Sequence, residues 1–202
     1  MAAHGLVHGE LGLNCIHLCV DMQRLFGPGY PWAFPWLQKV LPAVEELCGS
    51  HPERTLFTRF IPAEREGDGR GTWQRYYRRW PEVTLERAGV EAVQLLPSLE
   101  RFVPPAHVLD KKVYSPWSEG RLDHVMAERE IDTVIVTGGE TDVCVLATVL
   151  GAVDRGLRVV LVTDALCSSS DATHDALMEL YLSRFSQQIE AATTSEVLAQ
   201  WR

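Results

Sequence analysis

Residues 132–144 read Asp-Thr-Val-Ile-Val-Thr-Gly-Gly-Glu-Thr-Asp-Val-Cys, and this segment indicates the fold class. Its first half is a β-branched run of the kind found in strands that are buried on both faces of a parallel sheet. Its second half contains a turn with two glycines, and the pattern of residues 143–155 is helical up to Gly156. A strand, a turn and a helix in this order are the repeating unit of parallel α/β sheets.

The remainder of the chain continues this alternation. Further strands are expected at residues 14–20, 54–58, 107–113, 157–162 and 188–192, and further helices at 36–49, 120–130, 171–184 and 195–201, with weak helical character at 90–102. Strands that alternate with helices of about 10–15 residues indicate βαβ units. The sequence therefore predicts one domain over residues 1–202, an α/β fold whose mostly parallel sheet is covered by helices on both faces.

Composition excludes several classes of protein. The 202 residues include 19 Lys and Arg against 27 Asp and Glu, a net charge of −8, whereas proteins that bind nucleic-acid backbones carry a basic face. No run of about 18 apolar residues occurs, so no contact with a membrane is expected. The five cysteines form no C-x-x-C pair, and the first ten residues contain no Lys or Arg. These features predict free thiols and a cytoplasmic location.

Candidate catalytic residues follow the expected strands, where open α/β sheets bind their ligands. Cys144 opens a helix, where unpaired N–H groups and the helix dipole lower the pKa of a thiol and offer an oxyanion hole. Asp21 ends one strand, and Lys111 and Lys112 end another on opposite faces, so only one lysine faces the cleft. Each residue also has a structural alternative. Cys144 could be a small buried side chain, Asp21 a turn cap, and the lysine a solvated charge.

Four segments resemble the motifs of the isochorismatase-like cysteine hydrolases. Residues 20–26 resemble the family's D-x-Q-x-x-F, and residues 111–117 resemble its K-x-x-x-S-x-F, with Trp117 in place of Phe. Residues 137–148 resemble T-G-x-x-T-x-x-C-V-x-x-T/A, and residues 162–165 resemble the V-x-D-A that ends the next strand. The order and spacing of these motifs cover nearly all of residues 14–200.

The resemblance implies a three-layer α/β/α sandwich with an Asp–Lys–Cys triad. By motif, Asp21 is the general base and acid, Lys111 the orienting cation, and Cys144 the nucleophile. Lys111 is chosen over Lys112 because the family's lysine precedes its serine, here Ser115, by four residues. The resemblance also implies a cis peptide between Gly139 and Glu140, which directs the N–H groups of Glu140 and Cys144 to the oxyanion. The expected substrate-binding residues are Gln23, Phe26, Tyr114 and Trp117.

One departure concerns metal binding. Nicotinamidases of this family bind a metal through an aspartate and histidines, the first of them just after the second strand. Residues 58–62 of this chain read Thr-Arg-Phe-Ile-Pro at that place, and the seven histidines lack the spacing of a ligand set. We therefore expect no metal and no other cofactor.

Residues 59–80 are the second departure, because they are rich in arginine and aromatic residues. They are expected to form a lid or a contact between subunits of a homo-oligomer, or else a solvated insertion in which neighbouring acidic residues neutralise the arginines.

The sequence thus predicts a metal-independent cysteine hydrolase that cleaves a non-peptide C–N bond in a small amide, carbamoyl or ureido compound. Two alternatives stay open at this point. One is a vinyl-ether hydrolase of the isochorismatase type, which needs Asp21 but no thiol. The other is a thiol-redox or binding protein on the same fold, in which Cys144 forms a sulfenic acid.

Overall fold

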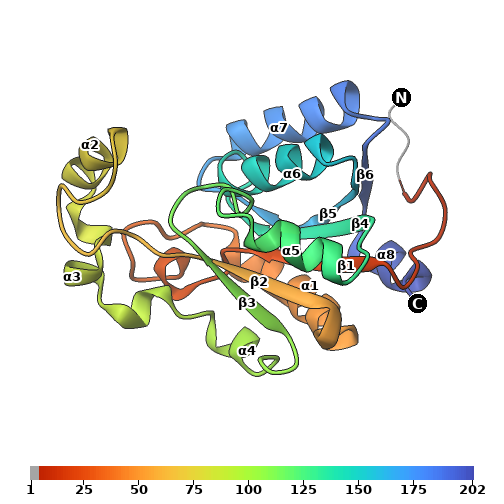
Figure 1. The fold of residues 1–202 in the computed structure, drawn as a ribbon, viewed down its shortest axis with the longest axis horizontal. Helices are drawn as coiled ribbons and strands as arrows, with labels where there is room; N and C mark the ends of the chain where they lie inside the picture. The colour runs from red at the N-terminus through yellow and green to blue at the C-terminus, as the bar shows by residue number, and fades with distance from the viewer. Residues whose placement is uncertain (1–4) are drawn as a thin grey trace.

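A computed structural model describes residues 5–202, which form one six-stranded sheet between two layers of helices (Figure 1). The strands are β1 (Cys15–Val20), β2 (Thr55–Phe60), β3 (His107–Lys111), β4 (Thr133–Gly139), β5 (Arg158–Cys167) and β6 (Ile189–Ala192). Their order is β3-β2-β1-β4-β5-β6, and every neighbouring pair is parallel. The three-layer α/β/α architecture expected from the sequence is confirmed.

The order of the strands places the site. The chain begins in the middle of the sheet at β1, moves outward through β2 to β3, and then returns to β4 on the other side of β1. The direction of winding therefore reverses between β1 and β4, and such a switch point opens a crevice beyond the carboxyl ends of the strands. Every residue of β1 and β4 is buried, as their apolar and β-branched sequences require.

The helices bury their apolar residues on the two faces of the sheet. On one face lie α1 (Leu37–Ser50), α4 (Pro97–Glu100) and α8 (Thr194–Gln200), and on the other lie α5 (Arg121–Glu128), α6 (Cys144–Asp154) and α7 (Asp171–Arg184). The short helices α2 (Thr72–Arg79) and α3 (Leu85–Ala88) stand apart from both layers, at the left of Figure 1. Within residues 5–202, no helix has the length and apolar character that crossing a bilayer requires.

Several element boundaries differ from the expected ones, and β3, for example, ends at Lys111 and not at residue 113. β2 runs on to Phe60, and β5 runs on to Cys167, so residues 162–165 lie inside this strand and do not end it. Asp164 is accommodated there because its carboxylate accepts hydrogen bonds from the N–H and the hydroxyl of Thr194, at 2.8 and 2.9 Å. Residues 90–102 form two short pieces, a 3₁₀ turn at Val90–Val93 and α4, which Pro97 begins.

Candidate active site

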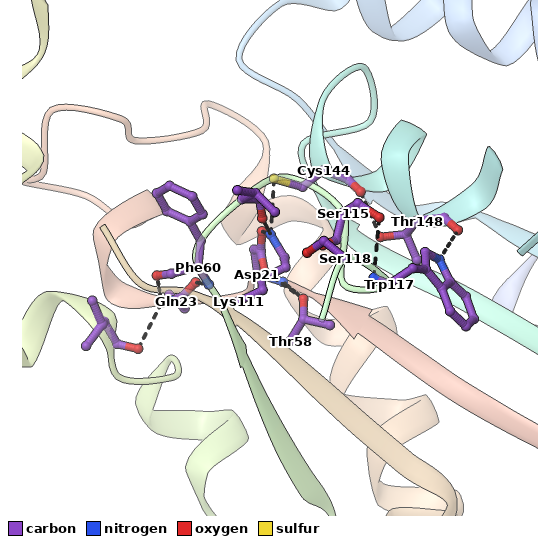
Figure 2. A network of polar contacts seen from close by, with 12 residues as sticks. Asp21, Gln23, Thr58, Phe60, Lys111, Ser115, Trp117, Ser118, Cys144 and Thr148 are labelled. Atoms are coloured by element: carbon purple, nitrogen blue, oxygen red, sulfur yellow. Dashed lines mark hydrogen bonds and ion pairs between the residues drawn. The ribbon is translucent and has the colours of Figure 1, made fainter. Parts of the chain in front are cut away.

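Asp21, Lys111 and Cys144 meet beyond the carboxyl ends of the strands (Figure 2). The ammonium nitrogen of Lys111 lies 2.6 Å from Oδ2 of Asp21 and 3.4 Å from Sγ of Cys144. Asp21 follows β1, Lys111 ends β3, and Cys144 begins α6 directly after β4 and its turn. The side chain of Lys111 crosses the width of β2, which lies between β3 and β1 in the sheet.

The backbone around Asp21 aims its carboxylate at the lysine. Asp21 has a left-handed conformation, with φ at 51°. Its N–H donates to the carbonyl oxygen of Thr58 on the neighbouring strand β2 at 3.2 Å. The hydroxyl of Thr58 donates in return to Oδ1 of Asp21 at 2.6 Å. A carboxylate buried this deeply needs such partners, because water no longer solvates it.

Lys111 is a buried cation whose partners compensate its burial. Burial lowers the pKa of its ammonium group, but the charges of Asp21 and Cys144 raise it more, so that its pKa stands above the ordinary value. The nitrogen also donates to the carbonyl oxygen of Val113 at 3.3 Å. Lys112, by contrast, is exposed. Of the two adjacent lysines, the structure thus brings Lys111 to the cysteine, as its spacing to Ser115 implied.

The thiol of Cys144 differs from the expectation in one respect. Its place at the first position of α6 predicted a lowered pKa, whereas its pKa is raised well above 9.0. Burial is the main cause, and the negative charge of Asp21 adds to it, while Lys111 opposes both. The structure therefore corrects the prediction of a lowered pKa, because the helix end and one lysine do not outweigh desolvation.

The turn between β4 and α6 exposes two backbone donors beside the thiol. The peptide bond between Gly139 and Glu140 is cis, and the N–H groups of Val143 and Val145 both donate to the carbonyl of Glu140, each at 3.0 Å. Within residues 5–202, the N–H groups of Glu140 and Cys144 themselves have no acceptor. They are available to an oxyanion at this position.

Both glycines of this turn are required by close contacts. Gly138 has φ at +102°, and a Cβ at this position would lie 2.1 Å from the carbonyl oxygen of Val20. A Cβ at Gly139 would lie 2.3 Å from the ring of Phe34. Any side chain here would displace β1 or the wall of the cavity.

A cavity of about 330 Å³ opens at Cys144, and its walls are mainly aromatic. The lining rings are those of Phe26, Trp32, Phe34, Phe60, Tyr76, Trp80 and Tyr114, together with Glu140, Val143 and Ser169. Tyr76 belongs to α2 and Trp80 follows it, so the segment 59–80 supplies part of the wall. Sequence reasoning placed Phe26 and Tyr114 here and missed Phe60, Tyr76 and Trp80, whose only signal was the aromatic content of that segment.

Gln23 and Trp117 were expected to bind substrate, and the structure corrects both. The amide of Gln23 donates to the carbonyls of Phe60 and Val93 at 3.0 and 2.9 Å and accepts from the N–H of Phe60 at 2.7 Å. The indole of Trp117 donates to the carbonyl of Thr148 at 2.9 Å and packs on Gly151, where a Cβ would lie 2.2 Å from the ring. Both side chains tie backbone segments together and do not line the cavity.

The residues at the cavity do not form a metal site of the nicotinamidase kind. Residues 58–62 contain no Asp or His, and Arg59 within β2 pairs with Asp110 through two hydrogen bonds of 2.7 and 2.9 Å. Among residues 5–202, the one group of three side chains suited to a metal is His17, Cys19 and Cys48, which is buried away from the cavity.

The ring nitrogens of His17 already have partners. The hydroxyl of Thr137 lies 2.7 Å from Nε2 and that of Thr55 lies 3.3 Å from Nδ1. This buried histidine is a structural residue of β1 whose two ring nitrogens both have partners.

Comparisons with known proteins show relatives in sequence and in fold. The chain is 26% identical over 163 residues to nicotinamidase 3 of Arabidopsis thaliana, an alignment that covers 80% of this chain and 77% of that protein. Among solved structures, a cysteine hydrolase from Pseudomonas syringae superposes with a TM-score of 0.80 at 23% identity, covering 99% and 98% of the two chains. N-carbamoylsarcosine amidase from Thermoplasma acidophilum superposes with a TM-score of 0.71 at 19% identity, covering 89% and 96%.

The family model of the isochorismatase domain matches residues 15–193 of this chain. The match runs from the first strand, which leads to Asp21, to the end of the last strand, and it includes Lys111 and Cys144. The chain therefore belongs to the isochorismatase family of hydrolases.

Proposed function

We propose that this protein is a cysteine hydrolase that cleaves the C–N bond of a small amide, carbamoyl or ureido compound without a metal. One observation carries the proposal. Lys111 bridges the carboxylate of Asp21 and the sulfur of Cys144, at 2.6 and 3.4 Å, at the inner end of an aromatic cavity. Base, cation and nucleophile in mutual contact are the arrangement that activates a thiol.

The first half of the reaction forms an acyl-enzyme. Asp21 accepts the proton of Cys144, and the thiolate attacks the carbonyl carbon of the substrate, which forms a C–S bond and a tetrahedral oxyanion. The N–H groups of Glu140 and Cys144 donate to that oxyanion. When the intermediate collapses, the C–N bond breaks, and Asp21 returns the proton to the leaving nitrogen.

The second half consumes one water molecule. Asp21 takes a proton from water, the hydroxide attacks the thioester carbon, and the C–S bond breaks to release an acid or carbamate. The proton then returns from Asp21 to Cys144. Because Lys111 remains paired with Asp21, it holds the carboxylate in place and stabilises the thiolate that forms transiently beside it.

The raised pKa of Cys144, which burial and Asp21 cause, is compatible with this mechanism. A thiol that stays protonated in the resting enzyme is ionised only when Asp21 removes its proton during attack. The ion pair of Asp21 and Lys111 thus persists between turnovers, and burial of all three groups strengthens each electrostatic contact. The same cavity also suits the expected role of residues 59–80 as a lid, because Tyr76 and Trp80 close one side of it.

Covalent catalysis is tested by mass spectrometry of enzyme quenched during the hydrolysis of a panel of small amides. An acyl adduct is expected on the peptide that contains Cys144. Cys144→Ala should abolish ammonia release, whereas Cys15→Ala, a matched change of a buried cysteine far from the cavity, should retain it. Full activity of Cys144→Ala would remove the thiol from the mechanism and favour the vinyl-ether reaction, which Asp21 alone performs.

The cellular setting is also part of this proposal. All five cysteines are free, which suits the reducing environment of the cytoplasm. We further expect a homo-oligomer, and light scattering of the purified protein at several concentrations tests this expectation, which a monomer at every concentration would refute.

A further inference from the structure

The cavity at Cys144 is a cage of aromatic rings around Trp32. The centroid of the Trp32 ring lies 6.2 Å from that of Phe26, 6.3 Å from Phe60, 5.8 Å from Tyr76 and 6.5 Å from Trp80. These rings come from three separate parts of the chain, namely the loop after β1, the end of β2, and α2 with the residue that follows it. Their convergence is a property of the fold and not of one local segment.

The lining of the cavity, within residues 5–202, contains an acidic side chain and no basic side chain. Of the residues that line it within the described part of the chain, Glu140 is the one with a charged side chain, and no Arg or Lys is among them. The carboxylate of Glu140 accepts hydrogen bonds from the N–H and the hydroxyl of Ser169, both of which are neutral donors. The positive charge of Lys111 is already matched by Asp21 at 2.6 Å.

Another cation, Arg79, lies close to one ring of the cavity wall. Its guanidinium lies 4.6 Å from the centroid of the Trp80 ring, but the side chain is exposed and does not line the cavity. A carboxylate on a substrate would therefore enter a site that already holds an unpaired acidic group. A positive group would meet ring faces, which attract cations through their quadrupoles, and a carboxylate.

We propose that the substrate is a small amide, carbamoyl or ureido compound whose non-reacting end carries a positive charge, held by the aromatic cage and by Glu140. This inference rests on the proposed function, because it names the substrate class for the same site. The reacting carbonyl lies at Cys144 with its oxygen toward the N–H of Glu140, and the ammonium group lies among the rings. The side chain of Glu140 thus serves specificity while its backbone serves the reaction.

Isosteric substrates test the inference. Trimethylammonioacetamide and 3,3-dimethylbutanamide have the same shape and differ by one positive charge, and malonamate supplies a negatively charged amide of similar size. We expect kcat/KM for the cation to exceed that for its neutral isostere at least tenfold, with malonamate poorest. Equal or better hydrolysis of the neutral compound, or a preference for malonamate, would overturn the inference.

Variants assign the preference to Glu140. Glu140→Gln should reduce the ratio of cationic to neutral kcat/KM at least fivefold, whereas Glu128→Gln, which removes the same charge from an exposed position on α5, should leave the ratio unchanged. An unchanged ratio in Glu140→Gln would show that this side chain does not select the charge. The comparison of substrates on the unmodified protein decides the main point even where a variant is unstable.

Binding to Cys144→Ala separates this inference from the proposed function. Titration followed by tryptophan fluorescence reports binding without any hydrolysis, and the cationic amide should again bind at least tenfold more tightly than its isostere. If the unmodified protein cleaves no amide but the binding preference is present, the proposed reaction is wrong and the cation site stands. If amides are cleaved but neither assay shows a preference, this inference alone is wrong.

Discussion

The hydroxyl of Thr58 donates to Oδ1 of Asp21 at 2.6 Å, and Oδ1 is the carboxylate oxygen that Lys111 does not contact. Each oxygen of the proposed base therefore has one donor, and both donors come from strands on the same side of β1. The carboxylate is held between these two donors. This relationship makes Thr58 a positioning residue, since it acts on the reaction through Asp21.

Replacing Thr58 tests this role. Thr58→Val keeps the volume but removes the donor, and we expect kcat to fall about 10- to 100-fold, the range in which a misdirected base loses its contribution. Thr58→Ser restores the hydroxyl and should recover most of the activity, which a loss caused only by packing would not. Equal activity of the valine variant and the unmodified protein would show that Lys111 alone positions the carboxylate.

The two adjacent lysines should differ sharply in effect. Lys111→Ala leaves the buried carboxylate of Asp21 without its cation, and we expect turnover to fall by about three orders of magnitude or more. Lys112→Ala is the matched control, because that side chain is exposed and should lose little activity. Steady-state kinetics with circular dichroism spectra of both variants make the comparison. The opposite ranking would mean that β3 carries a different register in solution.

Alkylation of Cys144 should report its raised pKa. Because the thiolate is the reactive form, the rate of modification by iodoacetamide follows the fraction of thiolate. Since burial and Asp21 raise the pKa of Cys144 well above 9.0, the rate in the free enzyme should still increase with pH at pH 9. Peptide mass spectrometry after timed quenching measures the rate at Cys144 alone. A plateau below pH 8 would contradict the raised pKa.

Acid should destabilise the fold through His17. Burial lowers the pKa of His17 to about 3, while in the unfolded chain it titrates near 6.5. Between these values the unfolded state binds the extra proton, so the free energy of unfolding is fully retained above pH 6.5 and falls as the pH drops toward 3. One such group contributes a slope of at most about 1.4 kcal/mol per pH unit.

Urea denaturation at several values between pH 6.5 and pH 4.5 measures this slope. His17→Gln should flatten it by about the contribution of one group, even where the variant is less stable at every pH. The exposed His124 on α5 provides the control variant His124→Gln, which should keep the slope of the unmodified protein. Identical slopes in all three proteins would show that His17 is not a buried neutral imidazole.

Chelation should leave activity intact. Among the residues that line the cavity, one carboxylate and one thiol are side chains that commonly bind metals. Arg59 lies in residues 58–62, where the sequence comparison with nicotinamidases expected the first metal ligands. Exhaustive dialysis against EDTA should therefore preserve kcat within about twofold of the untreated enzyme. Loss of turnover that zinc or another divalent ion restores would contradict the metal-independent mechanism.

The parallel sheet and the meeting of Asp21, Lys111 and Cys144 could be predicted from the amino-acid sequence. Strand and helix periodicity are local properties, and parallel strands bring their carboxyl ends to one edge, so residues that end strands or follow them meet without further information. The extension of β5 past Asp164 was not predicted, because the prediction used local patterns alone. A charged residue interrupts the local apolar pattern, and its partner, Thr194, lies far along the chain.

The lining of the cavity and the pKa of its thiol depend on contacts between distant segments, which local sequence patterns do not predict. Gln23 and Trp117 carry motif positions of the family, yet their partners at Phe60, Val93 and Thr148 come from distant segments and draw both side chains into the interior. Tyr76 and Trp80 reach the cavity because both rings pack against Trp32, which lies far from them in the sequence. The raised pKa of Cys144 also depends on tertiary contacts, because desolvation is set by all the groups that pack around the thiol and not by its position in a helix.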